Sequence, residues 1–204
     1  MESVRLPLRP AYPIRTERLV LRPIVASDFD AVLDMQSRPE LVRYLMWDVM
    51  DRDAVAVFLE RRVRQTAIDG DDTAIVLAAT IPPSDRVMGE FMIRLTSARH
   101  RQGEIGWSLH PDAQGHGYAT EAARELLRLG FEDLGLHRIA ADADPRNTGS
   151  LRIMERLGMR READYVDAFF LKGEWVGETH YGILEDEWRA LQPTDASGEQ
   201  VANR

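Results

Sequence analysis

The first third of the chain shows one strand pattern followed by two helix patterns. Between residues 17 and 24, apolar Leu19 and Leu21 alternate with polar neighbours, which predicts a short strand. Ser27 and Asp28 have the composition of a helix N-cap, and apolar residues at helical spacing follow to residue 36. A second helix is predicted from residue 51 or 53 to about residue 68, because one face of it carries the apolar side chains Val55, Phe58, Leu59 and Val63.

The middle of the chain predicts three strands with short connections. Residues 73–79, 87–95 and 102–109 have strand patterns, and turn-rich pieces such as Pro82-Pro83-Ser84-Asp85 separate them. Connections this short join antiparallel neighbours, so the three strands are predicted to form an antiparallel meander.

A helix with a small-residue face is predicted after the loop at residues 111–117. Its apolar positions recur at helical spacing in Ala119, Ala122, Ala123, Leu126, Leu127 and Gly130. Residues 138–143 then predict a strand, residues 147–157 a short helix that Gly158 ends, and residues 160–170 and 178–184 two last strands around Gly173. The pattern predicts an α/β (α+β) fold: a mixed, mainly antiparallel sheet of about seven strands, flanked by helices, with one strand–loop–helix–strand crossover.

The chain is predicted to form one domain, since 204 residues suffice for one sizeable core and are few for two. The proline-rich residues 1–14 are predicted to be an extended segment that lies over the surface. Residues 15–191 are predicted to be the domain, and the polar residues 192–204 a mobile tail. No internal repeat or linker divides the chain.

Composition excludes several classes of function. The sequence is 44% hydrophobic and 29% charged, as in soluble globular proteins, and lacks an apolar window long enough to span a membrane, so we expect a cytoplasmic protein. Without cysteine it has no disulfide, thiolate metal site or thiol nucleophile. The net charge of −8 argues against a nucleic-acid partner. No metal site is expected, because metal-ligand spacing is absent among His100, His110, His137 and His180.

The most informative motif is the loop at residues 114–119. Gly115 and Gly117 stand directly before a predicted helix, so backbone N–H groups can come close to a ligand there. Such a loop either holds a diphosphate or is only a tight turn. It lacks the Lys-Ser/Thr of a nucleotide P-loop and the third glycine of a dinucleotide-binding motif, so neither nucleotide interpretation fits.

This loop resembles the acetyl-CoA motif of the GNAT superfamily of N-acetyltransferases, Gln/Arg-x-x-Gly-x-Gly/Ala, which stands here as Gln114-x-x-Gly117-x-Ala119. Other segments are similar to the RimJ/RimL branch and follow in the same order over residues 15–190: Thr16-Glu-Arg-Leu-Val-Leu-Arg, Gly115-His-Gly-Tyr-Ala-Thr-Glu-Ala, Asp144-Pro-Arg-Asn-Thr-Gly-Ser and Glu155-Arg-Leu-Gly-Met. The resemblance implies a GNAT-like sheet whose fourth and fifth strands splay apart and leave a cleft for acetyl-CoA.

The resemblance also implies which residues bind the acyl donor. The pantetheine arm would pair with the backbone of Trp107, Ser108 and Leu109, and Asn147 would bind its amides. The pyrophosphate would lie on backbone N–H groups of the loop and the first helical turn, in Gly115, His116, Gly117, Tyr118, Ala119 and Thr120, and Gln114 begins this cofactor-binding motif.

Direct acetyl transfer to a primary amine needs a base, because an amine with a pKa of about 8–10 must first lose a proton. The resemblance places Glu104 in that role, and Glu90 on the neighbouring strand is the second candidate. The base position of the RimL branch falls on Phe169, so that assignment does not transfer, and Asp167 is a remote alternative.

A group that protonates the departing thiolate is less clearly marked. Many members of the superfamily place a tyrosine seven residues after the asparagine, and that position is Met154 here. Ser150 matches the serine proposed for this role in the RimL branch, while a serine in a first helical turn is also a common cap.

The acceptor stays open between a protein or peptide N-terminus and a small-molecule amine. The resemblance places its pocket at residues 44–53 and 167–175, which both mix aromatic with acidic side chains and so suit an ammonium group beside apolar surface. The alternatives are a non-catalytic acyl-CoA-binding sensor or regulatory module, and a nucleotide-binding regulatory protein. Because members of the family are often dimers, a homodimer is also an option.

Overall fold

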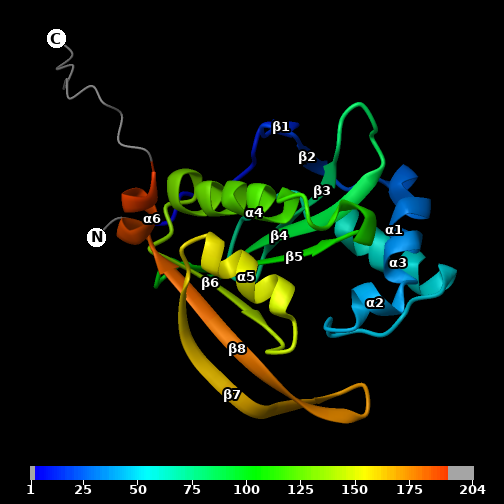
Figure 1. The fold of residues 1–204 in the computed structure, drawn as a ribbon. Helices are drawn as coiled ribbons and strands as arrows, with labels where there is room; N and C mark the ends of the chain where they lie inside the picture. Colours follow the sequence, from blue (N-terminus) through cyan, green and yellow to red (C-terminus); the bar gives the residue numbers. More distant parts are fainter. Residues whose placement is uncertain (1–2, 193–204) are drawn as a thin grey trace.

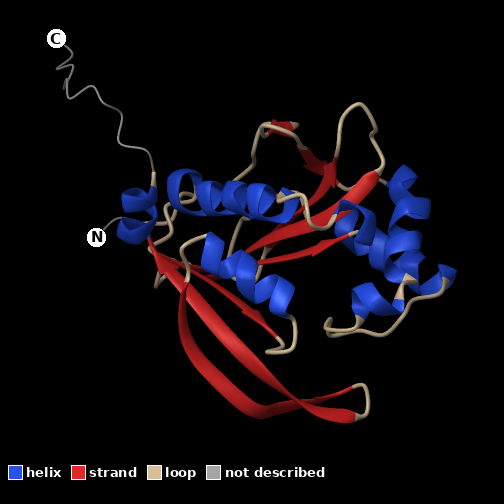
Figure 2. Ribbon diagram, viewed as in Figure 1, coloured by secondary structure: helices blue, strands red, loops and turns tan. Residues whose placement is uncertain are grey.

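The computed structural model describes residues 3–192, in which helices cover both faces of one eight-stranded sheet (Figures 1 and 2). The strand order is β1-β2-β3-β4-β5-β6-β8-β7. The strands are β1 (Ile14–Arg15), β2 (Val20–Pro23), β3 (Ala74–Thr80), β4 (Val87–Ser97), β5 (Gln102–Leu109), β6 (Arg138–Ala143), β7 (Arg160–Leu171) and β8 (Glu174–Leu184). The α-helices are α1 (Phe29–Gln36), α2 (Pro39–Val42), α3 (Arg52–Val63), α4 (Tyr118–Arg128), α5 (Thr148–Arg156) and α6 (Glu185–Leu191).

The predicted fold class is confirmed, with the two-residue β1 as an additional strand. β3, β4 and β5 form the antiparallel meander, and the β5–α4–β6 crossover gives a parallel pair. That pair is short: its register runs only from Gln102–Arg138 to Glu104–Ala140. Beyond Glu104, β5 continues beside β4 alone, so β5 and β6 splay apart as the resemblance implies.

Each face of the sheet has its own apolar core. Phe91, Ile93 and Ile105 face the helices α4 and α5 and belong to one cluster with Ala122 and Leu126 of α4. On the other face, β3 packs against α1 and α3 in a second cluster, which contains Val32, Val55, Phe58, Leu59, Val76 and Ala78. Figure 1 shows α4 and α5 together on one side and α1, α2 and α3 grouped at one end of the sheet.

The second helix is shorter than predicted, because α3 ends at Val63 and not near Ile68. After Val63 the backbone pairs with other segments: Gln65 accepts a hydrogen bond from Val76, and Thr66 and Ile68 form bridges with Ile75 and Leu8. These long-range pairs replace the i to i−4 bonds that continue a helix. The helices α2 and α6 were not predicted, since one or two turns carry too little periodicity.

The N-terminal segment takes part in the core more than predicted. Leu8 is buried, and its backbone exchanges two hydrogen bonds with Ile68. Of the predicted mobile tail, residues 193–204 lie outside the described residues. No helix within residues 3–192 is both long and apolar enough to cross a membrane.

We expect Gly103→Ala to destabilise the short parallel pair. A Cβ at Gly103 would lie 2.6 Å from Cδ1 of Leu136 and 2.9 Å from the carbonyl oxygen of Arg94, which is part of the sheet and cannot move aside. Urea denaturation should show a loss of about 1–3 kcal/mol in the free energy of unfolding. Gly70→Ala is the control, because nothing lies within 4 Å of its Cβ; we expect a change within about 0.5 kcal/mol. Equal effects of the two variants would contradict this account.

Candidate active site

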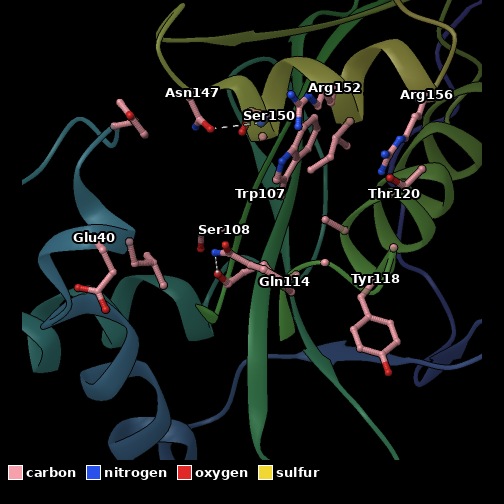
Figure 3. Close-up of a pocket in the computed structure, with 18 of the residues that line it drawn as sticks. Glu40, Trp107, Ser108, Gln114, Tyr118, Thr120, Asn147, Ser150, Arg152 and Arg156 are labelled. Carbon is pink, nitrogen blue, oxygen red and sulfur yellow. Dashed lines mark hydrogen bonds between the residues drawn. The ribbon is translucent and has the colours of Figure 1, made fainter. Parts of the chain in front are cut away.

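A cavity of about 480 Å³ opens where β5 and β6 diverge, between the N-terminus of α4 and the helix α5 (Figure 3). It extends to α2, so residues from four parts of the chain meet in it. Its lining residues are Glu40, Leu41, Tyr44, Leu45, Trp107, Ser108, Leu109, Gln114, Gly115, Gly117, Tyr118, Ala119, Thr120, Asn147, Gly149, Ser150, Arg152, Ile153 and Arg156.

The cavity brings together the residues predicted to bind the acyl donor, with one exception. His116 does not line it, while the other ten do: Trp107, Ser108, Leu109, Gln114, Gly115, Gly117, Tyr118, Ala119, Thr120 and Asn147. Ser150 lines the cavity as well, whereas Glu104, Glu90 and Asp167 do not.

The loop before α4 presents an uncapped helix N-terminus to this cavity. Gly115 and Gly117 have φ angles of 81° and 83°, in the left-handed region that favours glycine. Gly117 is the N-cap of α4 and supplies no side-chain hydrogen bond to the first turn. The N–H groups at the start of α4 are therefore available to an anion, which the helix dipole also favours. The side chain of Gln114 has a structural role, since its Nε2 donates to the Leu109 carbonyl at 3.0 Å.

One edge of β5 is the second feature of the cavity. From Ile105 to Leu109, one edge of β5 pairs with β4, while the other edge no longer pairs with β6. The edge toward β6 thus offers backbone N–H and C=O groups beside Trp107, Ser108 and Leu109. An extended ligand with amide groups can pair with such an edge as an added strand does.

The helix α5 forms the opposite wall and begins at Asn147. The Asn147 Oδ1 accepts the backbone N–H of Ser150 at 3.2 Å and caps the helix, which leaves the Asn147 amide nitrogen as a donor. The Ser150 side chain is therefore not the cap. No hydrogen bond to its hydroxyl group is found among the described residues. Met154 is fully buried in the core and does not line the cavity.

Two arginines of α5 were missed by the sequence analysis. Arg152 and Arg156 are spaced by four residues, line the cavity and are exposed. Figure 3 shows Arg156 extending from α5 toward Thr120 of α4. Within residues 3–192 neither guanidinium forms an ion pair, whereas Arg146 near the start of the same helix pairs with Asp144 and Glu174. Their four-residue spacing was visible in the sequence, but their lack of partners was not.

Glu104 lies at the last paired position before the splay, on the sheet face opposite α4. Its Oε2 accepts a hydrogen bond from Arg94 at 2.6 Å, and its side chain is 27% exposed. Asp142 of β6 shares this face, two residues beyond the pair of Glu104 with Ala140. Burial, together with the negative charges of Glu104 and Glu178, raises the pKa of Asp142 to about 6, although part of the side chain stays exposed. The splay is therefore flanked by two carboxylates, of which the sequence analysis named one.

Glu90 is held in an ion pair beneath α3. Its carboxylate lies 2.8 Å from Arg62, and both side chains are nearly buried, with 12% and 11% exposed. Burial raises the pKa of Glu90, and Arg62 opposes that shift. The guanidinium of Arg62 also stacks on the Phe58 ring. Glu90 thus joins α3 to the sheet and does not reach the cavity.

The far end of the cavity is formed by α2 and the residues after it. Tyr44 and Leu45 come from the predicted acceptor segment, while Glu40 and Leu41 lie before it. No residue of the other predicted segment, 167–175, lines the cavity, but the tip of the β7–β8 hairpin lies against α2. There Lys172 Nζ donates to the carbonyl oxygens of Val42 at 2.5 Å and Arg43 at 3.4 Å.

Comparison with known proteins identifies the architecture. The family model described as acetyltransferase (GNAT) domain matches residues 18–160. The uncharacterized N-acetyltransferase YnaD of Bacillus subtilis (strain 168) is 32% identical over 175 residues, which cover 86% of this chain and 98% of YnaD.

Two further comparisons cover a solved structure and a relative with a named substrate. The crystal structure of a GNAT-family acetyltransferase from Bacillus anthracis superposes with a TM-score of 0.75 at 30% identity, over 85% of this chain and 98% of that chain. The spermidine N(1)-acetyltransferase of Escherichia coli (strain K12) is 28% identical over 95 residues, 47% of this chain and 51% of that enzyme.

The raised pKa of Asp142 predicts a pH-dependent effect of Asp142→Asn on stability. Since the native pKa of about 6 exceeds that of an exposed aspartate, the wild-type protein is favoured by this group at low pH and loses that contribution as the pH rises through 6. Urea denaturation from pH 4 to 7.5 should show Asp142→Asn gaining stability relative to wild type between about pH 4 and 6. Asp30→Asn removes an almost fully exposed carboxylate and should show no such trend. A pH-independent difference for Asp142→Asn would contradict the assignment.

Proposed function

This chain belongs to the GNAT family of acetyltransferases, and on that premise we propose that it transfers the acetyl group of acetyl-CoA directly to a primary amine. The observation that carries the proposal is the convergence of an uncapped helix N-terminus and a free strand edge on one cavity. The first suits a diphosphate and the second suits an amide-containing arm. CoA carries both groups in one molecule.

The residues of the cavity fit the parts of CoA in order. Backbone N–H groups of Gly115 to Thr120 would hold the diphosphate, and the β5 edge at Trp107–Leu109 would pair with the pantetheine amides. The free amide nitrogen of Asn147 would donate to the same arm. Arg152 and Arg156 have no acidic partner among the described residues, so we assign them to the phosphate groups.

The reaction needs a proton acceptor and a proton donor at opposite sides of the thioester. When bound, acetyl-CoA supplies an activated acetyl group. Glu104, at the last residue pair before β5 and β6 diverge, would take the proton from the acceptor ammonium, directly or through water. A backbone N–H near Leu109 would stabilise the developing oxyanion, and the unpaired hydroxyl of Ser150 would donate a proton to the departing thiolate. Asp142, with its pKa near 6, is the second carboxylate able to act as base.

The acceptor end of the cavity favours an amine carried by an apolar group. Glu40, which lies 3.5 Å from Arg38, offers a carboxylate to an ammonium, and Leu41, Tyr44 and Leu45 add apolar surface to the same cavity. The relative from Escherichia coli is named for a polyamine, and the RimJ/RimL-like motifs favour a protein N-terminus. We therefore propose both classes as acceptors to be tested.

A non-catalytic acyl-CoA sensor is the alternative, and one observation favours it. Glu104 is already bound to Arg94 at 2.6 Å, which reduces its availability to an incoming ammonium. A sensor would bind acetyl-CoA without releasing a free thiol in the presence of any amine.

We expect calorimetric titration to show binding of acetyl-CoA, weakened by Arg152→Ala and Arg156→Ala. Loss of a charge-assisted hydrogen bond to phosphate costs about 1.5–3 kcal/mol, so each variant should bind about tenfold or more weakly. Arg99→Ala, which removes an exposed arginine outside the cavity, should bind as wild type. Displacement of acetyl-CoA by ATP or GTP would instead support a nucleotide-binding protein, and absence of acetyl-CoA binding would overturn the proposal.

We expect Glu104→Gln to lower turnover at least about a hundredfold, because general base catalysis contributes roughly 10²–10⁴ to a rate. Thiol release from acetyl-CoA would be measured across polyamines, other small amines and N-terminal peptides. The affinity for acetyl-CoA should stay within about twofold, since Glu104 lies outside the cavity lining. Full activity of Glu104→Gln combined with loss of activity in Asp142→Asn would move the base to Asp142.

A further inference from the structure

The segment Thr16-Glu17-Arg18, which the proposed chemistry does not use, lies against the first turn of α4. The Thr16 hydroxyl donates to Glu121 Oε1 at 2.6 Å, and the Arg18 backbone N–H donates to the same oxygen at 2.8 Å. Arg18 Nε donates to the other oxygen, Oε2, at 2.8 Å. The Glu121 carboxylate thus joins the turn before β2 to α4 across more than a hundred residues of sequence.

Arg18 also reaches the phosphate-binding loop itself. Its Nη1 donates to the His116 carbonyl at 2.9 Å, and its guanidinium lies 4.9 Å from the centre of the Tyr118 ring. A Cβ on Gly117 would come within 3.4 Å of Arg18 Nη2. Within the described part of the chain, no other side chain donates a hydrogen bond to a carbonyl of Gly115, His116 or Gly117. Arg18 does not line the cavity, so it supports the loop from behind.

The strand β2, which follows Arg18, is anchored in the core. Leu19 and Leu21 are buried, and β2 pairs along its length with β3. The Thr16 hydroxyl also accepts the backbone N–H of Leu19 at 3.0 Å, which fixes the turn that carries Arg18. A rigid strand therefore holds the guanidinium against a loop that contains two glycines.

Arg18 also has an electrostatic role, because it neutralises the charge of Glu121. Although burial opposes ionisation, hydrogen bonds from Thr16 and Arg18 hold the pKa of Glu121 below its usual value, so the carboxylate stays charged. It sits in the first turn of α4, close to where a diphosphate would bind. Without Arg18 that negative charge would repel the ligand, and with Arg18 it is neutralised.

We propose that Arg18, fixed by Thr16 and Glu121, is a positioning residue that holds the Gly115–Gly117 backbone in the conformation that receives the CoA diphosphate. The inference rests on the proposed function for its ligand. The proposal gives the Thr16-Glu-Arg segment a role in donor binding, whereas the proposed transfer chemistry uses none of its residues.

Hydrogen exchange and calorimetry test the proposal without an acceptor amine. In the unliganded protein, Arg18→Met should increase amide exchange at residues 114–121 at least about threefold and leave β3 and β4 unchanged. Titration with CoA should show an affinity about tenfold or more below wild type. Arg18→Lys keeps the charge beside Glu121 and should recover part of the affinity. Arg124→Met makes the same change of charge on the exposed side of α4 and should bind CoA within about twofold of wild type.

The double variant Arg18→Met/Glu121→Gln separates the two roles of Arg18. Because it removes the unpaired carboxylate, it should bind CoA more tightly than Arg18→Met alone while its loop exchanges as fast. Unchanged loop exchange or unchanged CoA affinity in Arg18→Met, with wild-type binding intact, would overturn this inference alone. Failure of the wild-type protein to bind CoA would overturn the proposed function.

Discussion

The early end of pairing between β5 and β6 is the constraint on which the site depends. Three residue pairs, from Gln102–Arg138 to Glu104–Ala140, hold the strands together, and beyond them the strands diverge. Divergence leaves main-chain N–H and C=O groups of β5 without a strand partner, and such groups require water or a ligand. Because one short loop joins β5 to α4 in the crossover, the N-terminus of α4 opens at the same cleft. The crossover therefore brings an uncapped helix N-terminus, which suits an anion, beside a strand edge, which suits an amide-containing ligand.

Electrostatics then distinguishes the ends of the cavity. The chain has a net charge of −8, and its arginines commonly bind acidic neighbours, as Arg22 does with Asp28 and Asp85. Arg152 and Arg156 depart from this pattern within residues 3–192 and stand across the cavity from the start of α4. Positive charge in an otherwise acidic protein would give the proposed donor end a local attraction for phosphates, while Glu40 at the other end lies 3.5 Å from Arg38. The two ends of the cavity therefore differ in charge.

The residues that the sequence analysis named for the donor line one cavity because their signals are local. The glycine loop, the α4 pattern and Asn147 each lie in a short segment, and contiguous elements bring them together. The features that the sequence analysis missed or misplaced depend on contacts between distant segments. Arg152 looks like any exposed arginine until its lack of a partner is seen, and α3 ends early because residues 65–68 pair with β3 and the N-terminal segment. The raised pKa of Asp142 comes from burial and from Glu104 and Glu178 on two other strands, which no spacing rule identifies.

The acceptor end was hardest to predict for a related physical reason. Its walls come from α2, a helix of a single turn, and the residues after it, and Lys172 at the tip of the β7–β8 hairpin bonds to the end of α2. Lys172 and Gly173 both have positive φ and form the two-residue turn that directs the ammonium at the carbonyl oxygens of Val42 and Arg43, at the end of α2. The hairpin tip lies beyond the register that joins β8 to β6, which ends at the Ala143–Thr179 pair. Changes in α2 or at the hairpin tip can therefore alter this end of the cavity without breaking the pairing beside the cleft, and the donor motifs, which lie in other segments, leave the acceptor open.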